Sequence, residues 1–94
     1  MKSGYVYIIT NAYKNVIYIG VTSNLKDRIY QHKCGEGSEF SKKYRLNRLV
    51  WFEEYPNIKD AIFREKQIKN WKRKWKINLI REFNPKLRDL YEEI

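Results

Sequence analysis

Two short runs of β-branched and aromatic residues near the start of the chain place the tightest constraint on its fold. They cover residues 5–10 (YVYIIT) and 16–21 (VIYIGV), and five residues that favour a turn separate them. This pattern predicts an antiparallel β-hairpin. If the last residue of the first run pairs with Asn15, Tyr7 lies directly opposite Tyr18, so that both phenols occupy one face of the sheet.

The rest of the chain predicts helices around one further strand. Asn24 can cap a helix over residues 25–33, whose Arg28 and His32 are four positions apart and therefore neighbours on one side. The next ten residues, CGEGSEFSKK, contain two glycines and are expected to form a mobile loop. A third strand is predicted at residues 49–55, followed by a long helical stretch that begins near residue 58 and stops at Asn84-Pro85.

The charge balance points to a polyanionic partner. The 94-residue chain has a net charge of +9, and residues 61–82 hold eight basic and two acidic side chains. Clustered Lys and Arg bind phosphate polymers by releasing condensed counterions, so nucleic acid is the first partner to consider and an anionic membrane surface the second. A merely solubilising helix face is the plainer alternative. The candidate nucleic-acid-binding residues are Lys66, Lys69, Lys72, Arg73, Lys74 and Lys76.

A length of 94 residues leaves room for a single domain over residues 1–94. Cysteine usage and hydropathy indicate that this domain is cytoplasmic. The single cysteine, Cys34, excludes an internal disulfide, and one histidine with one cysteine cannot form a tetrahedral zinc site. No apolar run approaches the roughly 20 residues of a membrane span, and the N-terminus lacks the pattern of a signal peptide. We therefore expect a protein that is neither exported nor inserted in a membrane.

One ordered set of residues indicates chemistry. Tyr5-Val6-Tyr7 is followed after ten residues by Tyr18-Ile19-Gly20, then by Arg28 and His32 on the next helix, Glu65 on a later helix and Asn84 near the end. This set resembles the GIY-YIG nuclease family, above all its small stand-alone bacterial members. The resemblance covers almost the whole chain. The sequence departs from the family pattern at one position, since Tyr5 stands where the motif usually has glycine.

The resemblance implies an α+β fold with a three-stranded antiparallel sheet flanked by helices. The implied reaction is metal-dependent hydrolysis of a phosphodiester bond. DNA is favoured over RNA as the predicted substrate. Glu65 would hold one Mg²⁺ or Mn²⁺, whose remaining ligands are water and phosphate oxygens. A domain of this size has no room for a second, site-selecting domain, so a partner protein or an unusual substrate structure would supply specificity.

The resemblance also gives roles to the other residues of the set. Arg28 would contact the scissile phosphate with paired donors. Tyr7 is the first candidate for the general base if nearby cations lower the pKa of its phenol, and His32 is either the alternative base or a hydrogen-bond partner. Tyr18 would orient water or phosphate, and Asn84 would position the region around the metal ligand.

Each residue also has a structural reading. Tyrosines in a hairpin commonly pack in a core, and Glu65 can pair with Lys69 four residues later on the same helix. Two rival functions follow: a nucleic-acid-binding module without turnover, and a basic domain that binds acidic proteins. The catalytic hypothesis predicts that Tyr7, Tyr18, Arg28, His32 and Glu65 converge on one concave surface.

Overall fold

Three antiparallel strands form the centre of the computed structural model, which describes residues 2–94. The strands are β1 (Gly4–Thr10), β2 (Ile17–Thr22) and β3 (Arg48–Tyr55), arranged in the order β2-β1-β3. Strand β1 is central and almost entirely buried, as expected for a run rich in β-branched and aromatic residues between two partners. The predicted three-stranded antiparallel sheet is confirmed.

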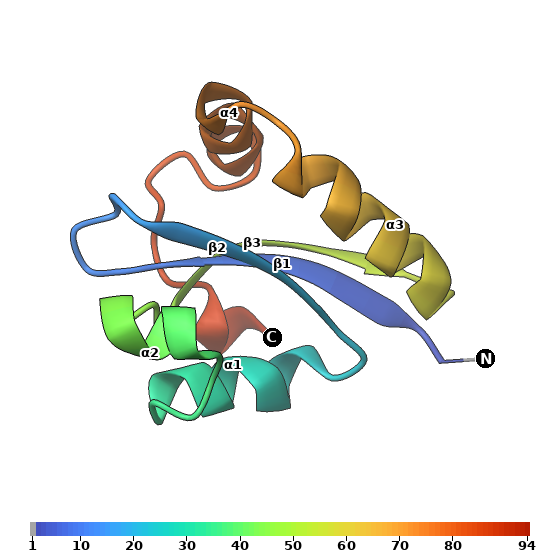
Figure 1. The fold of residues 1–94 in the computed structure, drawn as a ribbon, viewed down its shortest axis with the longest axis horizontal. Helices are drawn as coiled ribbons and strands as arrows, with labels where there is room; N and C mark the ends of the chain where they lie inside the picture. The colour runs from blue at the N-terminus through green and yellow to red at the C-terminus, as the bar shows by residue number, and fades with distance from the viewer. Residues whose placement is uncertain (1) are drawn as a thin grey trace.

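Helices cover both faces of this sheet (Figure 1), which confirms the α+β fold. On one face lie α1 (Leu25–Lys33), α2 (Glu39–Tyr44) and the short 3-10 helix η1 (Tyr91–Glu93), and on the other lie α3 (Ile58–Lys69) and α4 (Arg73–Phe83). Across residues 2–94, no helix has the length and apolar composition needed to cross a membrane.

The hairpin pairs two residues further along than the sequence predicted. Thr10 pairs with Ile17, and Tyr7 therefore lies opposite Gly20 instead of opposite Tyr18. A shift of two residues leaves every side chain on its predicted face, because successive side chains alternate between faces. Tyr7 and Tyr18 thus remain on the same side of the sheet as diagonal neighbours.

Side-chain hydrogen bonds within the hairpin loop explain the longer turn. The side-chain oxygen of Asn11 accepts hydrogen bonds from the backbone N–H groups of Asn15 and Val16, at 3.1 and 3.3 Å. The hydroxyl of Thr10 donates to the Val16 carbonyl at 2.7 Å. These bonds hold Asn15 and Val16 in the loop, so the strand β2 begins at residue 17.

The sheet separates two hydrophobic clusters. The cluster on the α3 and α4 face contains Val6, Ile8, Ile19, Val50, Trp51, Ala61, Ile68 and Ile80, and the cluster on the α1 face contains Tyr7, Ile9, Leu25, Ile29, Leu46, Leu49 and Leu90. Strand β3 has a bulge against Ile8 and Ile9. The extra residue allows Val50 and Trp51, although adjacent, to enter the same cluster.

Two predictions about the helices were wrong. The segment expected to be a loop contains α2, because the side chain of Ser38 accepts a hydrogen bond from the backbone N–H of Ser41 and caps a six-residue helix. The expected long helix is divided into α3 and α4, because the backbone of Lys72 is extended (φ −64°, ψ 148°) and starts a second helix. By contrast, α1 and its Asn24 cap were predicted correctly.

Candidate active site

The phenol of Tyr7 is the centre of a buried hydrogen-bonded group. Tyr7 lies on β1 with 1% of its surface exposed, and its hydroxyl is 3.0 Å from Nε2 of His32. Nε of Arg28 donates to the same hydroxyl at 3.3 Å. Arg28 and His32 reach Tyr7 together because they lie one turn apart on α1.

The hydrogen bonds of Ser41 determine which nitrogen of His32 carries the proton. The carbonyl of Ser38 can only accept, so the Ser41 hydroxyl donates to it at 3.0 Å. Oγ of Ser41 is then the acceptor for Nδ1–H of His32, 3.1 Å away. This leaves Nε2 of His32 without a proton, so the Tyr7 hydroxyl donates to Nε2 and accepts from Arg28.

Two glycines make room for this arrangement. A Cβ atom on Gly20 would lie 2.4 Å from Cζ and from the hydroxyl oxygen of Tyr7, so the phenol lies directly against the backbone of β2. A Cβ on Gly37 would lie 2.2 Å from Nδ1 of His32 and 2.6 Å from Oγ of Ser41. The glycine of the Tyr18-Ile19-Gly20 motif therefore has a steric role toward the first motif tyrosine.

Burial decides the protonation of Tyr7 and His32. Burial raises the pKa of the Tyr7 phenol, and the hydrogen bond and charge of Arg28 lower it only in part. The condition set for Tyr7 as a base, that nearby cations lower the pKa of its phenol, is therefore not met in this structure. Burial, with a smaller effect of the Arg28 charge, lowers the pKa of His32 to about 4. At neutral pH, His32 is an uncharged proton acceptor beside a protonated phenol.

Tyr18 lies beside this group at the outer strand of the sheet. Its ring centroid is 6.2 Å from that of His32 and 6.2 Å from that of Phe40. The ammonium of Lys69, from α3, lies 5.7 Å from the centre of the Tyr18 ring. Strand β2 is an edge strand, so a helix from the opposite face of the sheet can reach Tyr18 around that edge.

Glu65 approaches the same edge from α3. Its side chain is 13% exposed, and Oε2 lies 3.1 Å from the ammonium of Lys69, which in turn lies over the Tyr18 ring. After burial and Arg28, the charges of Tyr18 and Glu65 also act on the pKa of Tyr7 and raise it. The structure therefore brings Glu65 within electrostatic reach of the phenol, although it comes from the other helical layer.

The chemistry of the available donors fits a hard divalent cation. Mg²⁺ is usually held by one or two carboxylates together with substrate phosphate and water. Within residues 2–94, no three His, Cys, Asp or Glu side chains come together. Glu65 is a mostly buried carboxylate that already has a cationic partner, Lys69, at 3.1 Å. This carboxylate could supply one ligand of such a site once Lys69 has moved away from it.

The structure gives Asn84 a place away from this group. Its side-chain nitrogen donates to the carbonyls of Val50 and Arg88, at 3.1 and 2.8 Å, and its oxygen accepts from the backbone N–H of Arg88 at 3.3 Å. The side chain is buried, and these bonds fasten the segment after α4 to β3. These contacts are with the backbone of Val50 and Arg88, and the positioning role that the sequence suggested for Asn84 stays a prediction.

The predicted nucleic-acid-binding residues surround the junction between α3 and α4. Lys66, Lys69, Lys72, Arg73 and Lys74 are exposed, and Lys76 is half-buried. Arg73 donates to the carbonyl of Asn15 in the hairpin loop at 2.6 Å, while Lys69 lies over Tyr18. The basic stretch therefore runs beside the β2 edge and meets the candidate active site at Lys69.

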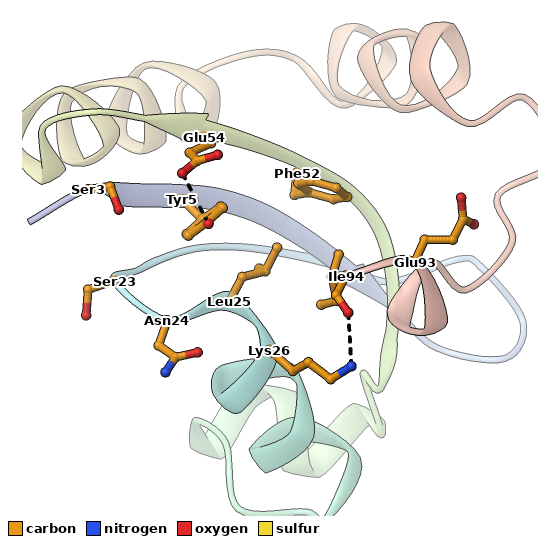
Figure 2. A pocket seen from close by; sticks show the side chains of 10 residues that line it. All are labelled: Ser3, Tyr5, Ser23, Asn24, Leu25, Lys26, Phe52, Glu54, Glu93 and Ile94. Atoms are coloured by element: carbon orange, nitrogen blue, oxygen red, sulfur yellow. Dashed lines mark hydrogen bonds between the residues drawn. The ribbon is translucent and has the colours of Figure 1, made fainter.

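Tyr5, which stands in the place of the motif glycine, belongs to another part of the surface. Its hydroxyl donates to the carboxylate of Glu54 at 3.2 Å, and both line a hollow of about 360 Å³ (Figure 2). Lys26 also lines this hollow and donates to the carbonyl oxygen of Ile94 at 2.9 Å. Neither of these bonds involves Tyr7, Arg28 or His32.

Sequence reasoning missed one residue of the group, Ser41, and one contact, that of Lys69 with Tyr18, although it foresaw the pair of Lys69 with Glu65. Ser41 fixes the orientation of His32, and Lys69 joins Glu65 to Tyr18. Ser38 was a usable signal for the start of the helix that carries Ser41, because serine is a favoured N-cap residue. The contact between Lys69 and Tyr18 depends on how α3 packs across the sheet, for which the sequence holds no local signal.

Comparison with known proteins gives a consistent result. The family model described as GIY-YIG catalytic domain matches residues 3–78. A UPF0213 protein of Staphylococcus haemolyticus is 35% identical over 82 residues, which cover 87% of this chain and 99% of the relative. A UPF0213 protein of Pediococcus pentosaceus is 31% identical over 80 residues, covering 85% and 84%. The solution NMR structure of a UPF0213 protein from Bacillus halodurans is similar with a TM-score of 0.53 and 28% identity, covering 83% of this chain and 82% of that chain.

Proposed function

Since this chain belongs to the GIY-YIG family of nuclease domains, we propose that it is a metal-dependent endonuclease that hydrolyses phosphodiester bonds in DNA. The observation that carries the proposal is the hydrogen-bonded chain from Arg28 through Tyr7 and His32 to Ser41. It joins a cation suited to phosphate, a phenol and a neutral imidazole at one point. A hairpin tyrosine that serves only as core would need one partner for its hydroxyl, and here the hydroxyl has two.

In this proposal, Tyr7 and His32 act together as the proton acceptor. A water attacking phosphorus gives its proton to the Tyr7 oxygen while the Tyr7 proton passes to Nε2 of His32. Because His32 is neutral at pH 7 and its Nε2 has a free lone pair, this transfer needs no phenolate in the resting protein. Ser41 holds the imidazole in the tautomer that can accept.

Arg28 and Tyr18 bind the substrate. The guanidinium of Arg28 keeps N–H groups beyond the one directed at Tyr7, and these can contact a phosphate that replaces the Gln31 side chain, now 3.0 Å from Nη1. Tyr18 is half-buried at the sheet edge, where its hydroxyl can orient water or a phosphate oxygen. Lys69 and its basic neighbours hold the flanking backbone.

Glu65 is the proposed ligand of Mg²⁺ or Mn²⁺, and Lys69 must move from its carboxylate when the cation binds. A cation bound there supplies Lewis-acid stabilisation of the charge that develops on the phosphoryl oxygens and the leaving group. The ammonium of Lys69, once released from Glu65, is free to contact the DNA backbone. The affinity for metal should therefore be higher in the presence of substrate.

The test is cleavage of a DNA panel in Mg²⁺ or Mn²⁺. Linear, nicked, flapped and branched DNAs are incubated with the wild-type protein and with Glu65→Ala and Arg28→Ala. We expect both variants to lower the rate by at least about 10²-fold, because each removes a group needed in the transition state. Glu65→Ala should leave the affinity for DNA largely unchanged, since the basic stretch provides the binding.

Matched variants control for general damage to the protein. Glu82→Ala and Arg81→Ala remove an exposed carboxylate and an exposed guanidinium on α4, and both should cleave at the wild-type rate. Cleavage that survives Glu65→Ala, or that proceeds in chelator, would contradict the mechanism. If wild-type protein binds every DNA but cleaves none, the family fold serves here as a binding module.

A further inference from the structure

A row of aromatic side chains leads away from the candidate active site over α2. Tyr18 lies 6.2 Å from Phe40, and Phe40 lies 4.8 Å from Tyr44, measured between ring centroids. Phe40 and Tyr44 are 45% and 39% exposed. Two adjoining aromatic rings on the surface of so short a helix are not needed for the core, so the row has room for another binding partner.

The row ends at a hollow between α2 and the hairpin loop. The hollow has a volume of about 380 Å³, and its lining includes Tyr44, Arg45 and Arg48 on one side and Tyr13 on the other. Tyr13 is 86% exposed at the tip of the hairpin loop. Aromatic faces and guanidinium groups thus border the same space, of a size that suits a small planar ligand.

The charge around the row is positive. Residues 38–48 contain four basic side chains and one acidic side chain, and the ammonium of Lys43 lies 5.3 Å from the centre of the Tyr44 ring. Planar aromatic rings with interleaved Lys and Arg are the features by which proteins bind single-stranded nucleic acid, with bases stacked on the rings and phosphates paired with the cations. An acidic peptide would satisfy the cations and leave the rings unused.

We propose that Phe40, Tyr44 and Tyr13 form a binding track for an unpaired DNA strand that leaves the active site at Tyr18. The proposal rests on the proposed nuclease function and names its substrate class: duplex DNA with a single-stranded extension, such as a flap or an overhang. Paired bases are stacked inside the duplex and cannot lie on these rings. The track is separate from the basic α3–α4 junction, which would hold the duplex backbone.

The test is binding in chelator, so that it does not depend on catalysis. Three fluorescent DNAs share one duplex of 20 base pairs: a blunt form, a form with an eight-nucleotide extension, and a form whose extension is abasic. We expect the extended DNA to bind at least about 10-fold more tightly than the other two, because only it offers bases for stacking. The abasic extension has the same phosphates and controls for charge.

Variants connect the preference to the track. Phe40→Leu and Tyr44→Leu keep apolar bulk but lose the stacking face, and each should remove roughly 5- to 10-fold of the preference. Tyr44→Phe keeps the ring and should retain the preference.

Two further variants are controls for the loss of exposed aromatic rings elsewhere. Tyr30→Leu and Phe63→Leu remove exposed rings from α1 and α3, and neither should change the preference for the extended DNA. Circular dichroism identifies any variant that has lost its fold, and Tyr13→Ala, in the exposed loop, provides a second probe.

The outcomes separate this inference from the proposed function. Equal binding of the base-bearing and abasic extensions would overturn the track, and so would a preference that Phe40→Leu and Tyr44→Leu leave intact. A protein with the extension preference but no metal-dependent cleavage would keep the track and lose the nuclease function. A protein that cleaves blunt and extended DNA alike, with no binding preference, would keep the nuclease function and lose the track.

Discussion

Burial changes the acid–base chemistry of the single histidine. Buried in the α1 face of the sheet with Tyr7 and Ser41 as partners, His32 is uncharged at neutral pH and directs its free lone pair at the phenol. Its pKa of about 4 also makes stability depend on pH. In the unfolded chain the histidine takes up a proton near pH 6.5, whereas in the folded protein it does so only near pH 4.

Between pH 6.5 and pH 4, the unfolded state therefore binds more protons than the folded state. Stability rises with pH over this window, and we expect the free energy of unfolding to fall by up to roughly 3 kcal/mol as pH drops from 7 to 4. Urea titrations at several pH values measure this. His32→Gln should flatten the dependence. The His32 ring resonances provide a direct check, and a titration midpoint near pH 6.5 in the folded protein would contradict the burial argument.

At Gly20 the prediction is steric. A methyl group there would meet the phenol of Tyr7 at 2.4 Å, and that phenol is held by two hydrogen bonds. We expect Gly20→Ala to lower the free energy of unfolding by about 1–3 kcal/mol, as overpacking does, and to displace the hydroxyl from His32. In a Tyr7→Ala background the same change should cost much less, and denaturant unfolding of all four proteins would reveal the non-additivity. Strictly additive effects would mean that the methyl group is accommodated elsewhere.

At the scale of elements, α2 has a structural and a chemical role. The Ser38 side chain caps its N-terminus, and one turn later Ser41 holds the imidazole of His32. The same short helix carries the exposed rings of Phe40 and Tyr44. Two glycines precede this segment, and Arg45 ends it in the left-handed conformation. The segment therefore resembles a loop in sequence, but it positions His32 and presents two aromatic rings at the surface.

Ser38→Ala and Ser41→Ala should have different consequences. Loss of the cap in Ser38→Ala should reduce stability by about 1 kcal/mol. Ser41→Ala should cost about 1–3 kcal/mol, because it leaves a buried Nδ1–H of His32 without an acceptor. Ser41→Ala should also change the tautomer of His32, which nitrogen chemical shifts of the ring report. Ser23→Ala, at an exposed loop position, is the control, and an unchanged tautomer in Ser41→Ala would contradict the assignment.

Local signals predicted the elements well, and long-range packing was harder to predict. Asn24 marked the start of α1, and runs of β-branched and aromatic residues marked the strands. The predicted hairpin register, with Thr10 opposite Asn15, was wrong because the Asn11 side chain holds both Asn15 and Val16 in the loop and Thr10 pairs with Ile17. The break between α3 and α4 was missed because the N-cap residue of α4 is Lys72, whose side chain makes no capping hydrogen bond and gives no sequence signal for a helix start.

The candidate site shows the same division. The motif order selected Tyr7, Tyr18, Arg28 and His32, which lie together on the α1 face, and Glu65, which meets Tyr18 through Lys69; their catalytic roles stay predictions. The protonation of Tyr7 could not be read from net charge, because burial outweighs the neighbouring cation. Desolvation of the phenol depends on how the helices of both layers pack against the sheet. This packing is known only once the fold is known, so the sequence pattern alone could not predict the pKa shift.

At the scale of the whole molecule, the sheet edge at β2 is where two layers with different functions meet. The α1 face provides the phenol and imidazole, and the α3 face provides the carboxylate and the basic stretch. Neither layer alone holds both the proton acceptor and the proposed metal ligand. A net charge of +9 favours the approach of a polyanion such as the proposed DNA substrate.

This division predicts how binding to duplex DNA depends on salt. Lys72 and Lys74 are exposed at the start of α4, whereas Lys59 is exposed near the start of α3, outside the basic stretch. If the first two contact phosphates, Lys72→Gln and Lys74→Gln should each weaken binding and reduce the slope of log affinity against log salt by about 1. Lys59→Gln should change the slope much less.

Fluorescence anisotropy of a blunt duplex over a range of salt concentrations measures these slopes. The expected effect is uniform across DNA sequences, because a phosphate contact carries no base information. Equal slopes for all three variants would show that net charge alone attracts DNA and that no part of the surface is preferred. A slope that falls only for Lys72→Gln and Lys74→Gln would instead place the duplex along the α3–α4 junction, next to the β2 edge at which Lys69 contacts Glu65 and Tyr18.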